Sequence, residues 1–262
     1  MALYCVCSAG GSPGVTTTAL ALALGWPREV VLAECDPAGR RILPGYLAER
    51  LDGPPGPGLL GLATALGGED VRVEDYTIPL AEQGRAWLLH GIRDPRHAAQ
   101  LARLWQPLAG LFIKAEVDVI ADVGRVGSPD TPMGLLAGAD LVVMVLRGTL
   151  SQVDAAQPRL DALLGALNWR VPVALCLIES GRYSAAAVSR ELFGLPMLAE
   201  LPHAPADANV LSDGARPRMA FRTCLLLRTA GNLGHQMRKL VEERAFHPET
   251  LPARAVPSRE AR

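Results

Sequence analysis

The sequence predicts a three-layer, doubly wound α/β domain, in which a mainly parallel sheet is covered by helices on both faces. Two observations predict this class. Short apolar runs alternate with segments of helical character along most of the chain, and such alternation is typical of parallel strands joined by crossover helices. The apolar runs are also nearly continuous, as expected for strands that are buried on both faces. A chain of 262 residues is long enough to bury the core of one large domain.

The first predicted strand, Leu3 to Cys7, leads into a glycine-rich turn and then into a helical run that ends near Gly25. The turn and the start of the helix read Ser8-Ala9-Gly10-Gly11-Ser12-Pro13-Gly14-Val15-Thr16-Thr17-Thr18. A strand, a glycine-rich turn and a helix are the context of a phosphate-binding loop. Glycines let successive backbone N–H groups point inward, and the helix N-terminus adds partial positive charge. The segment therefore predicts a phosphate site, with threonine hydroxyl groups available to a magnesium ion.

This segment departs from the standard pattern G-x-x-x-x-G-K-[ST] at one position. With Gly14 as the last glycine and Thr16 as the hydroxyl residue, the lysine position holds Val15. That lysine normally places a positive charge on the β- and γ-phosphates. The two lysines of the chain, Lys114 and Lys239, lie far from the loop in sequence. We therefore expect the shape of a nucleotide site without its main cation.

Two further predicted strands carry a carboxylate at or near their ends. Val30 to Cys35 is followed by Asp36, and Val117 to Gly124 contains Asp122. Ligands of parallel sheets bind at the carboxyl ends of the strands, so both side chains are expected beside the glycine-rich loop. Asp36 either acts on a water molecule near a magnesium ion or starts a turn. Asp122 either reaches the metal shell of a nucleotide or simply ends its strand, and Asp118 is expected to face solvent.

The remaining elements follow the same alternation. Ser151 and Asp154 resemble a capping box at the start of a helix that Pro158 kinks or restarts, and Asp94 followed by proline is expected to start another helix. Further strands are predicted at 86–89, 139–146, 171–178 and 196–201, and further helices at 59–66, 184–193 and 219–245. The domain is predicted to span residues 1–246, with residues 247–262 as a disordered tail.

Composition and charge bear on the class of protein. The net charge is −1, so no overall attraction to nucleic acid or to anionic membranes is expected. The five cysteines lie mostly in apolar runs and are expected to be buried and reduced, which together with the lack of a signal peptide predicts a cytoplasmic protein. No apolar run reaches the roughly 18 residues of a membrane span, so no integral membrane segment is expected.

Five segments, in the same order, resemble the ParA/MinD family of partition and positioning ATPases. Gly11 to Thr17 resembles the family's deviant Walker A loop, Ala33 to Pro37 its D-x-D-P segment at switch I, and Val117 to Gly124 its Walker B strand with switch II. Ala137 to Asp140, followed by an apolar strand, is similar to the A-D-x-V-V-V-V segment. Leu201-Pro202, followed by Asp207 and Gly214, resembles the loop that flanks the nucleotide base. The resemblance covers most of the chain.

The resemblance implies a P-loop site for ATP and Mg²⁺. It places Mg²⁺ at the Thr16 hydroxyl with Asp122 in its outer shell, and it gives Asp36 a catalytic role near the attacking water. The residues that it assigns to the nucleotide are those of the loop and the base-flanking proline: Gly11, Ser12, Pro13, Gly14, Val15, Thr16, Thr17 and Pro202.

The chain departs from the family at three positions. Gly10 and Val15 stand where the family has its two loop lysines, and Glu179 stands where an asparagine often recognises the base. Each of four arginines near predicted strand ends either replaces a loop lysine or is a solvated surface residue: Arg40, Arg41, Arg125 and Arg147.

Three functions are compatible with these features. The first is a nucleotide-binding positioning or partition protein that hydrolyses ATP weakly or not at all. A G-S-P-G-V-T-T-T loop is similar to that of MinD-like proteins of high-GC bacteria, and the family's CpaE/TadZ members accompany pilus or secretion ATPases. The second is a pseudo-ATPase that acts as a non-catalytic interaction scaffold, and the third is a metabolic enzyme of the same fold, similar to dethiobiotin synthetase.

The first function carries expectations about partners. A homodimer is expected, with a protein partner in a positioning, pilus or secretion machine, and the protein is cytoplasmic or peripheral to membrane or nucleoid. Basic residues of the C-terminal region either bind non-specific DNA or form a solvated helix face diluted by Glu242 and Glu243: Arg216, Arg218, Arg222, Arg228, Arg238, Lys239 and Arg244.

Overall fold

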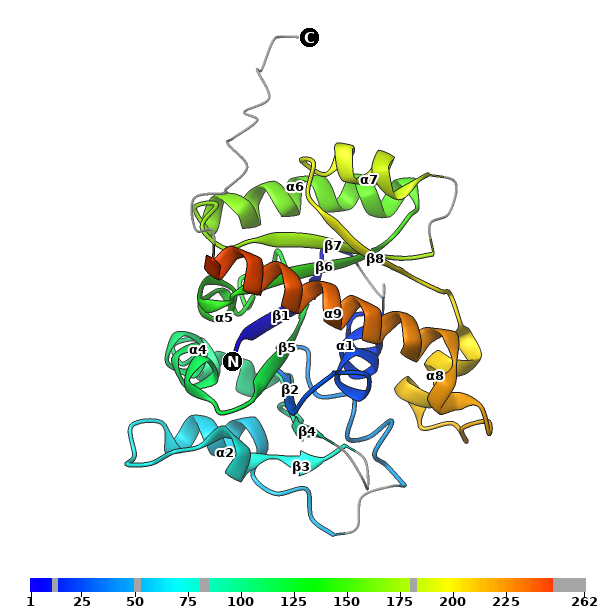
Figure 1. Ribbon diagram of the computed structural model, residues 1–262. Helices are drawn as coiled ribbons and strands as arrows, with labels where there is room; N and C mark the ends of the chain where they lie inside the picture. The colour runs from blue at the N-terminus through cyan, green and yellow to red at the C-terminus, as the bar shows by residue number, and fades with distance from the viewer. Residues whose placement is uncertain (11–13, 50–52, 81–84, 180–182, 247–262) are drawn as a thin grey trace.

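The computed structural model describes residues 1–10, 14–49, 53–80, 85–179 and 183–246, and these form three layers (Figure 1). The described residues contain an eight-stranded sheet with the strand order β3-β4-β2-β5-β1-β6-β7-β8. Every pairing in it is parallel except that of β3 with β4. The predicted fold class, a doubly wound and mainly parallel α/β sheet, is confirmed.

Each strand that was predicted from an apolar run is present, with ends that differ by two residues or fewer. The edge strand β3 was not predicted, because two residues give no periodic signal. The strands are β1 (Leu3–Ser8), β2 (Val30–Glu34), β3 (Ile78–Pro79), β4 (Ala86–Leu89), β5 (Asp118–Arg125), β6 (Leu141–Arg147), β7 (Val173–Ile178) and β8 (Met197–Leu201).

Alternate side chains of the central strands enter two separate cores, one on each face of the sheet. Tyr4 and Val6 belong to one core, whereas Cys5 and Cys7 belong to the other. The first core is closed by α1 (Val15–Leu24), α8 (Pro205–Asp213) and α9 (Leu225–Phe246). The second is closed by α2 (Gly58–Ala65), α3 (Ala98–Leu101), α4 (Trp105–Lys114), α5 (Met133–Gly138), α6 (Leu150–Ala166) and α7 (Ala185–Glu191).

The start of α6 differs from its prediction. The helix begins at Leu150, and its N-cap residue Thr149 makes no side-chain capping bond, so the capping box of Ser151 and Asp154 was wrong. The side chain of Gln152 instead accepts the backbone N–H of Arg147 at 3.1 Å, which holds the chain in the turn before the helix. Pro158 lies inside α6 and does not divide it.

The helix expected after Asp94 is divided into a 3-10 turn at Pro95–His97, α3 and α4. Asp94 does cap this segment, because its carboxylate accepts the backbone N–H of Arg96 at 2.9 Å. The predicted tail at 247–262 lies outside the described residues. None of the described helices has both the length and the apolar character needed to cross a membrane.

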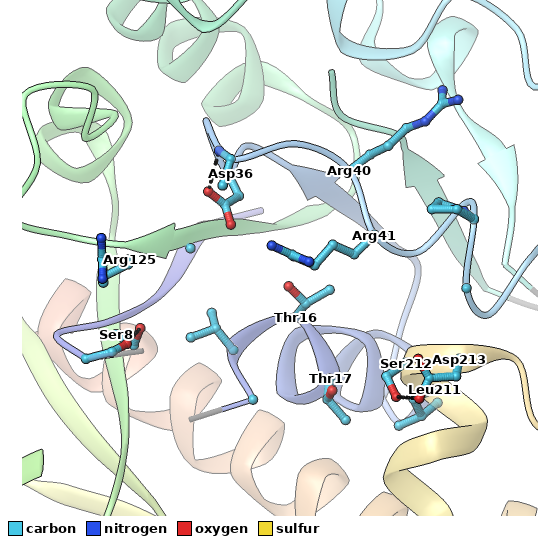
Figure 2. A pocket seen from close by; sticks show the side chains of 17 residues that line it. Ser8, Thr16, Thr17, Asp36, Arg40, Arg41, Arg125, Leu211, Ser212 and Asp213 are labelled. Carbon is cyan, nitrogen blue, oxygen red and sulfur yellow. Dashed lines mark hydrogen bonds between the residues drawn. The ribbon is translucent and has the colours of Figure 1, made fainter. Parts of the chain in front are cut away.

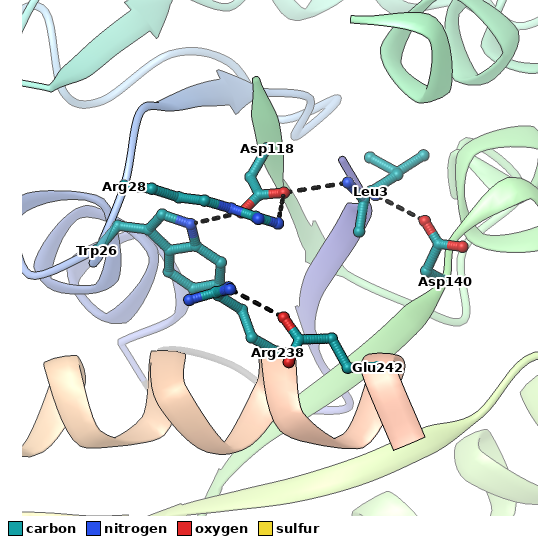
Figure 3. Close-up of polar contacts among 8 residues, drawn as sticks. Leu3, Trp26, Arg28, Asp118, Asp140, Arg238 and Glu242 are labelled. Atoms are coloured by element: carbon teal, nitrogen blue, oxygen red, sulfur yellow. Dashed lines mark hydrogen bonds and ion pairs between the residues drawn. The ribbon is translucent and has the colours of Figure 1, made fainter. Parts of the chain in front are cut away.

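Asp118 was expected to face solvent, and this was wrong. Its side chain is fully buried at the start of β5, where it pairs with Arg28 and accepts the indole N–H of Trp26 at 2.9 Å (Figure 3). The backbone N–H of Ala2 donates to the same carboxylate at 3.1 Å. The reason is strand alternation: Asp118 shares the α1 and α9 face with Ile120, and the turn after α1 brings its cationic partner to it.

Candidate functional site

The start of α1 presents unpaired backbone donors to the carboxyl edge of the sheet. Gly14 precedes the helix with φ of 93°, a conformation that favours glycine. The first helical hydrogen bond joins the N–H of Thr18 to the carbonyl of Gly14 at 2.8 Å. The N–H groups of Val15, Thr16 and Thr17 therefore have no partner within the helix, and the N-cap residue Gly14 has no side chain that could cap them. This is the geometry that binds an anion.

A cavity of about 760 Å³ lies against this helix start (Figure 2). Four of the predicted nucleotide-binding residues line it, namely Gly14, Val15, Thr16 and Thr17, and so does the predicted catalytic residue Asp36. Gly11, Ser12 and Pro13 lie outside the described residues. Pro202 follows β8 and is not among the described residues that line the cavity.

Asp122 lies under the cavity with its carboxylate almost fully buried. It interacts with the Thr16 hydroxyl through a side-chain hydrogen bond and accepts the backbone N–H of Gly124 at 3.0 Å. Burial raises the pKa of Asp122 to about 7, and the nearby carboxylates of Asp36 and Glu34 contribute to this rise. No ion pair of Asp122 is present among the described residues, and a buried acid in this situation is well suited to a divalent cation.

The donor set also indicates how such a cation would be held. The described residues contain no group of three or more His, Cys, Asp or Glu side chains that could hold a metal alone. Mg²⁺ is commonly bound by one or two protein oxygens together with phosphate oxygens. Thr16 and Asp122 fit that arrangement, so the residues present are compatible with Mg²⁺ that enters with a nucleotide.

Asp36 is half-buried above the helix start, and its carboxylate accepts the N–H of Ala38 at 2.8 Å. Burial raises the pKa of Asp36, while the charges of Arg41 and Arg125 oppose that rise. The carboxyl group rests on Gly124, where a Cβ atom would lie 2.3 Å from Asp36 Cγ. Gly124 also has φ of 68°. Only glycine therefore allows the end of β5 to pass beneath Asp36.

Three of the four candidate arginines line the cavity: Arg40, Arg41 and Arg125. Figure 2 shows that their side chains differ in direction. Arg41 reaches toward the space between Asp36 and Thr16, Arg125 lies on the opposite side, and Arg40 points away from the helix start. Arg147 is not among the described lining residues. The cavity therefore has cationic groups on two sides, although the loop itself supplies none.

The family resemblance placed Asp207 and Gly214 in a loop that flanks the base, whereas the structure forms α8 between Pro205 and Asp213. The C-terminal end of this helix is a wall of the cavity that was not predicted. Leu211, Ser212 and Asp213 line the cavity there. A signal for this helix was present, since Pro205 occupies its first turn and Gly214 ends it with φ of 69°. Gly45 packs against this end so closely that a Cβ atom would lie 2.1 Å from the Ser212 carbonyl oxygen.

Glu179 and Pro202 follow β7 and β8 at their carboxyl ends, and neither is among the described residues that line the cavity. Glu179 has φ of 59°, and one of its carboxylate oxygens is 3.4 Å from His203 Nδ1. Both side chains of this pair are exposed. The position where the family resemblance expects an asparagine thus carries an acid beside a histidine.

Comparison with known proteins gives a structural relationship and no sequence relationship. No protein-family model and no curated protein sequence matches the chain. Among solved structures, it is similar to the septum site-determining protein MinD of Pyrococcus horikoshii in complex with Mg-ADP, with a TM-score of 0.69 and 17% identity over 93% of this chain and 98% of that one.

Two further solved structures place the fold in the same group. A chain of the MinC:MinD cell division protein complex of Aquifex aeolicus gives a TM-score of 0.67 at 15% identity, over 91% of this chain and 96% of the other. A ParA family ATPase of Chlorobium tepidum gives 0.64 at 14% identity, over 94% and 98%. The chain therefore has the fold of the MinD and ParA ATPases.

Proposed function

We propose that this protein is a ParA/MinD-like nucleotide-binding protein that positions or partitions a cellular component and hydrolyses ATP slowly or not at all. The observation that carries the proposal is convergence at one cavity. The free N–H groups at the start of α1, the Thr16 hydroxyl, Asp36 and cationic side chains all meet there, with Asp122 directly beneath. These groups suit an anion that carries a magnesium ion.

Each group has a role in this proposal. The N–H groups of Val15, Thr16 and Thr17 bind phosphate oxygens, and the Thr16 hydroxyl together with Asp122 holds Mg²⁺. When bound, Mg²⁺ neutralises charge on the phosphates. Asp36 lies on the far side of the cavity from the helix start, where it orients a water molecule.

Weak hydrolysis follows from the loop itself. Val15 offers a backbone N–H but no ammonium group, and a hydrogen bond to a charged group is worth about 1.5–3 kcal/mol. The loss is larger for charge that develops in the transition state. The protein is therefore proposed to bind nucleotide more readily than it turns it over.

Partners and location are part of the same proposal. The solved relatives include MinD with Mg-ADP and MinD in a complex with MinC. By analogy, we propose a homodimer that acts with a protein partner, in the cytoplasm or peripheral to the membrane or nucleoid. We also propose that the component it positions is a pilus or secretion machine, as for the CpaE/TadZ members of the family.

A second candidate, a pseudo-ATPase scaffold, is favoured by one observation: the loop retains its helix start but not its lysine. In that case the cavity is a surface feature, and the fold provides only an interaction surface. Nucleotide binding separates the two candidates.

The test is the melting temperature with and without Mg-ATP. A ligand at 100 times its Kd stabilises the folded state by about 2.7 kcal/mol, which for a domain of this size raises the melting temperature by about 5–10 °C. Thr16→Ala should remove the shift, whereas Thr64→Ala, an exposed threonine on α2, should retain it. No shift at millimolar Mg-ATP would overturn the proposal and favour the scaffold.

A further inference from the structure

We infer that Arg41 is the phosphate-binding cation of this site, in place of the missing loop lysine, and that the buried carboxylate of Glu34 positions it. The inference rests on the proposed function, since it names the residue that completes that nucleotide site. It assigns the role to a segment that follows β2 and approaches the helix start from across the cavity.

The direction of the Arg41 side chain is the first observation. Arg41 and its neighbour Arg40 both line the cavity, but only the guanidinium of Arg41 is directed at the space above Thr16 (Figure 2). A phosphate held by the N–H groups of α1 would have that guanidinium on its opposite side. Arg125 stands further away, beside Ser8.

The second observation is that the guanidinium is free. Across the part of the chain that the structure describes, Arg41 makes no side-chain hydrogen bond and no ion pair. Most other arginines that approach a carboxylate in this protein are paired with it, such as Arg28 with Asp118 and Arg218 with Asp207. Arg41 thus keeps all five of its N–H donors available.

The third observation is that hydrogen bonds to Glu34 hold the backbone of Arg41 in position beside the cavity. Glu34, at the end of β2, is 3% exposed. Its Oε1 accepts the backbone N–H of Arg41 at 2.6 Å and that of Ile42 at 2.8 Å, and its Oε2 accepts the N–H of Gly91 at 3.2 Å. A buried carboxylate is costly unless it is hydrogen-bonded, and here its partners are the main chain that carries Arg41.

Two packing contacts complete this anchor. The Ile42 side chain is 1% exposed in the core beneath α1. Gly45 is pressed against the Ser212 carbonyl and also against the carbonyl of Arg41, where a Cβ atom would lie at 2.9 Å. The backbone of Arg41 is therefore fixed from below by Glu34 and from the side by α8, so only the side-chain torsions remain to be ordered when an anion binds.

Chemistry favours this residue for the role. A guanidinium is planar, remains charged and matches two phosphate oxygens at once, whereas an ammonium acts as a point charge. The cavity is open, and Arg41 is exposed, so the guanidinium can reach a phosphate without first breaking a pair inside the protein. Its charge already acts on the Asp36 carboxyl across the cavity.

The experiment measures the Kd of Mg-ATP and of inorganic tripolyphosphate by titration calorimetry. Arg41→Ala should weaken both by about 10- to 100-fold, the value of one hydrogen bond to a charged group. Arg41→Lys should restore part of the affinity. The matched control is Arg40→Ala, which removes the same charge from the same segment and should change either Kd by less than about threefold.

The positioning role of Glu34 is tested by a double-mutant cycle. The ligand in this cycle is tripolyphosphate without Mg²⁺, because Glu34 also acts on the Asp122 carboxyl that is proposed to hold the metal. Glu34→Gln should weaken its binding in the wild-type background but have no further effect in Arg41→Ala, because Glu34 acts on the phosphate through Arg41. A merely structural role would weaken binding equally in both backgrounds. If the wild-type protein binds Mg-ATP, and Arg41→Ala and Arg40→Ala change its Kd equally, the inference about Arg41 is overturned. The proposed function would then stand. No wild-type binding of Mg-ATP or tripolyphosphate would overturn both.

Discussion

The two ends of β5 carry the same side chain in opposite situations. Asp118 at the amino end and Asp122 near the carboxyl end are both buried, at 0% and 1% exposure, and both face α1. Asp118 is surrounded by donors: Arg28, the indole of Trp26 and the N–H of Ala2. Asp122 has the Thr16 hydroxyl and the N–H of Gly124, and no cationic side chain of the described residues pairs with it; burial raises its pKa to about 7.

This difference separates structure from function within one strand. At the amino end, Arg28 supplies the counter-charge of Asp118. This pair and Trp26 form a polar cluster that lies beside Arg238 and Glu242 of α9 (Figure 3). At the carboxyl end, acids, free amides and an unpaired arginine surround a cavity. A buried acid that is fully paired holds the fold together, and one that is left without a cation marks the place where a ligand is expected.

The largest expected effect is at the paired end. Asp118→Ala leaves two buried donors, the Trp26 indole N–H and the Ala2 N–H, without their acceptor, at a cost of about 1–3 kcal/mol each. Arg28 loses the same partner, but its side chain is 36% exposed and can be hydrated. The melting temperature should fall by about 10 °C, while the affinity for Mg-ATP should not change. The neighbouring exposed Glu29→Ala is the control. A decrease of less than about 1 kcal/mol in the free energy of unfolding would show that the cluster does not stabilise the fold.

Asp122→Asn should increase the stability of the folded protein in the absence of Mg²⁺ and nucleotide, whereas Asp118→Ala decreases it. The pKa of Asp122 is about 7 in the folded protein and about 3.9 in an unfolded chain. The unfolded chain therefore releases its proton first as pH rises, and stability falls between about pH 4 and pH 7. The asparagine variant lacks this loss, so it should be more stable than wild type by roughly 1–3 kcal/mol at pH 8.

The pH dependence of that gain is the sharper measurement. The difference in melting temperature between Asp122→Asn and wild type should be small near pH 5 and should grow toward pH 8. With Mg-ATP present, the same variant should lose the stabilisation given by the ligand. A gain that is independent of pH would mean that the Asp122 carboxyl is already ionised in the folded protein.

The smallest expected effect lies at the rim of the amino-end cluster. The Arg238 guanidinium donates a hydrogen bond from Nη2 to Glu242 Oε1 at 2.8 Å in an i,i+4 pair, and the Glu242 side chain is 57% exposed. Exposed pairs of this kind contribute about 0.3–0.5 kcal/mol. Denaturant unfolding of Glu242→Ala should therefore show a change within that range, and a cost above about 1.5 kcal/mol would place Glu242 in the structural cluster.

The sequence was sufficient for the architecture and for part of the site. Buried parallel strands leave a continuous apolar signal, so the central strands were located closely. Asp36 and Asp122 were placed correctly beside Thr16, because carboxyl ends of parallel strands share one edge. The direction of Asp118 was recoverable in principle, since it alternates in step with Asp122.

Other features depend on contacts that no local pattern encodes. Arg40 and Arg41 are adjacent and chemically identical, and long-range contacts orient them. The Arg40 N–H donates to the Ile92 carbonyl at 2.7 Å, the Arg41 N–H donates to Glu34, and Gly45 packs on α8. The wall formed by α8 is distant in sequence from every other part of the cavity. The roles of all the site residues remain predictions, and Gly11, Ser12 and Pro13 also lie outside the described residues.

The contact between Gly45 and Ser212 has a further consequence. At this point the main chain of Gly45 lies against the Ser212 carbonyl, so the close approach of the two segments requires glycine at residue 45 and does not involve the side chains that face the cavity. Residues that face the cavity can therefore vary while its breadth stays the same. Ligand preference can evolve at this place without rebuilding the scaffold that frames it.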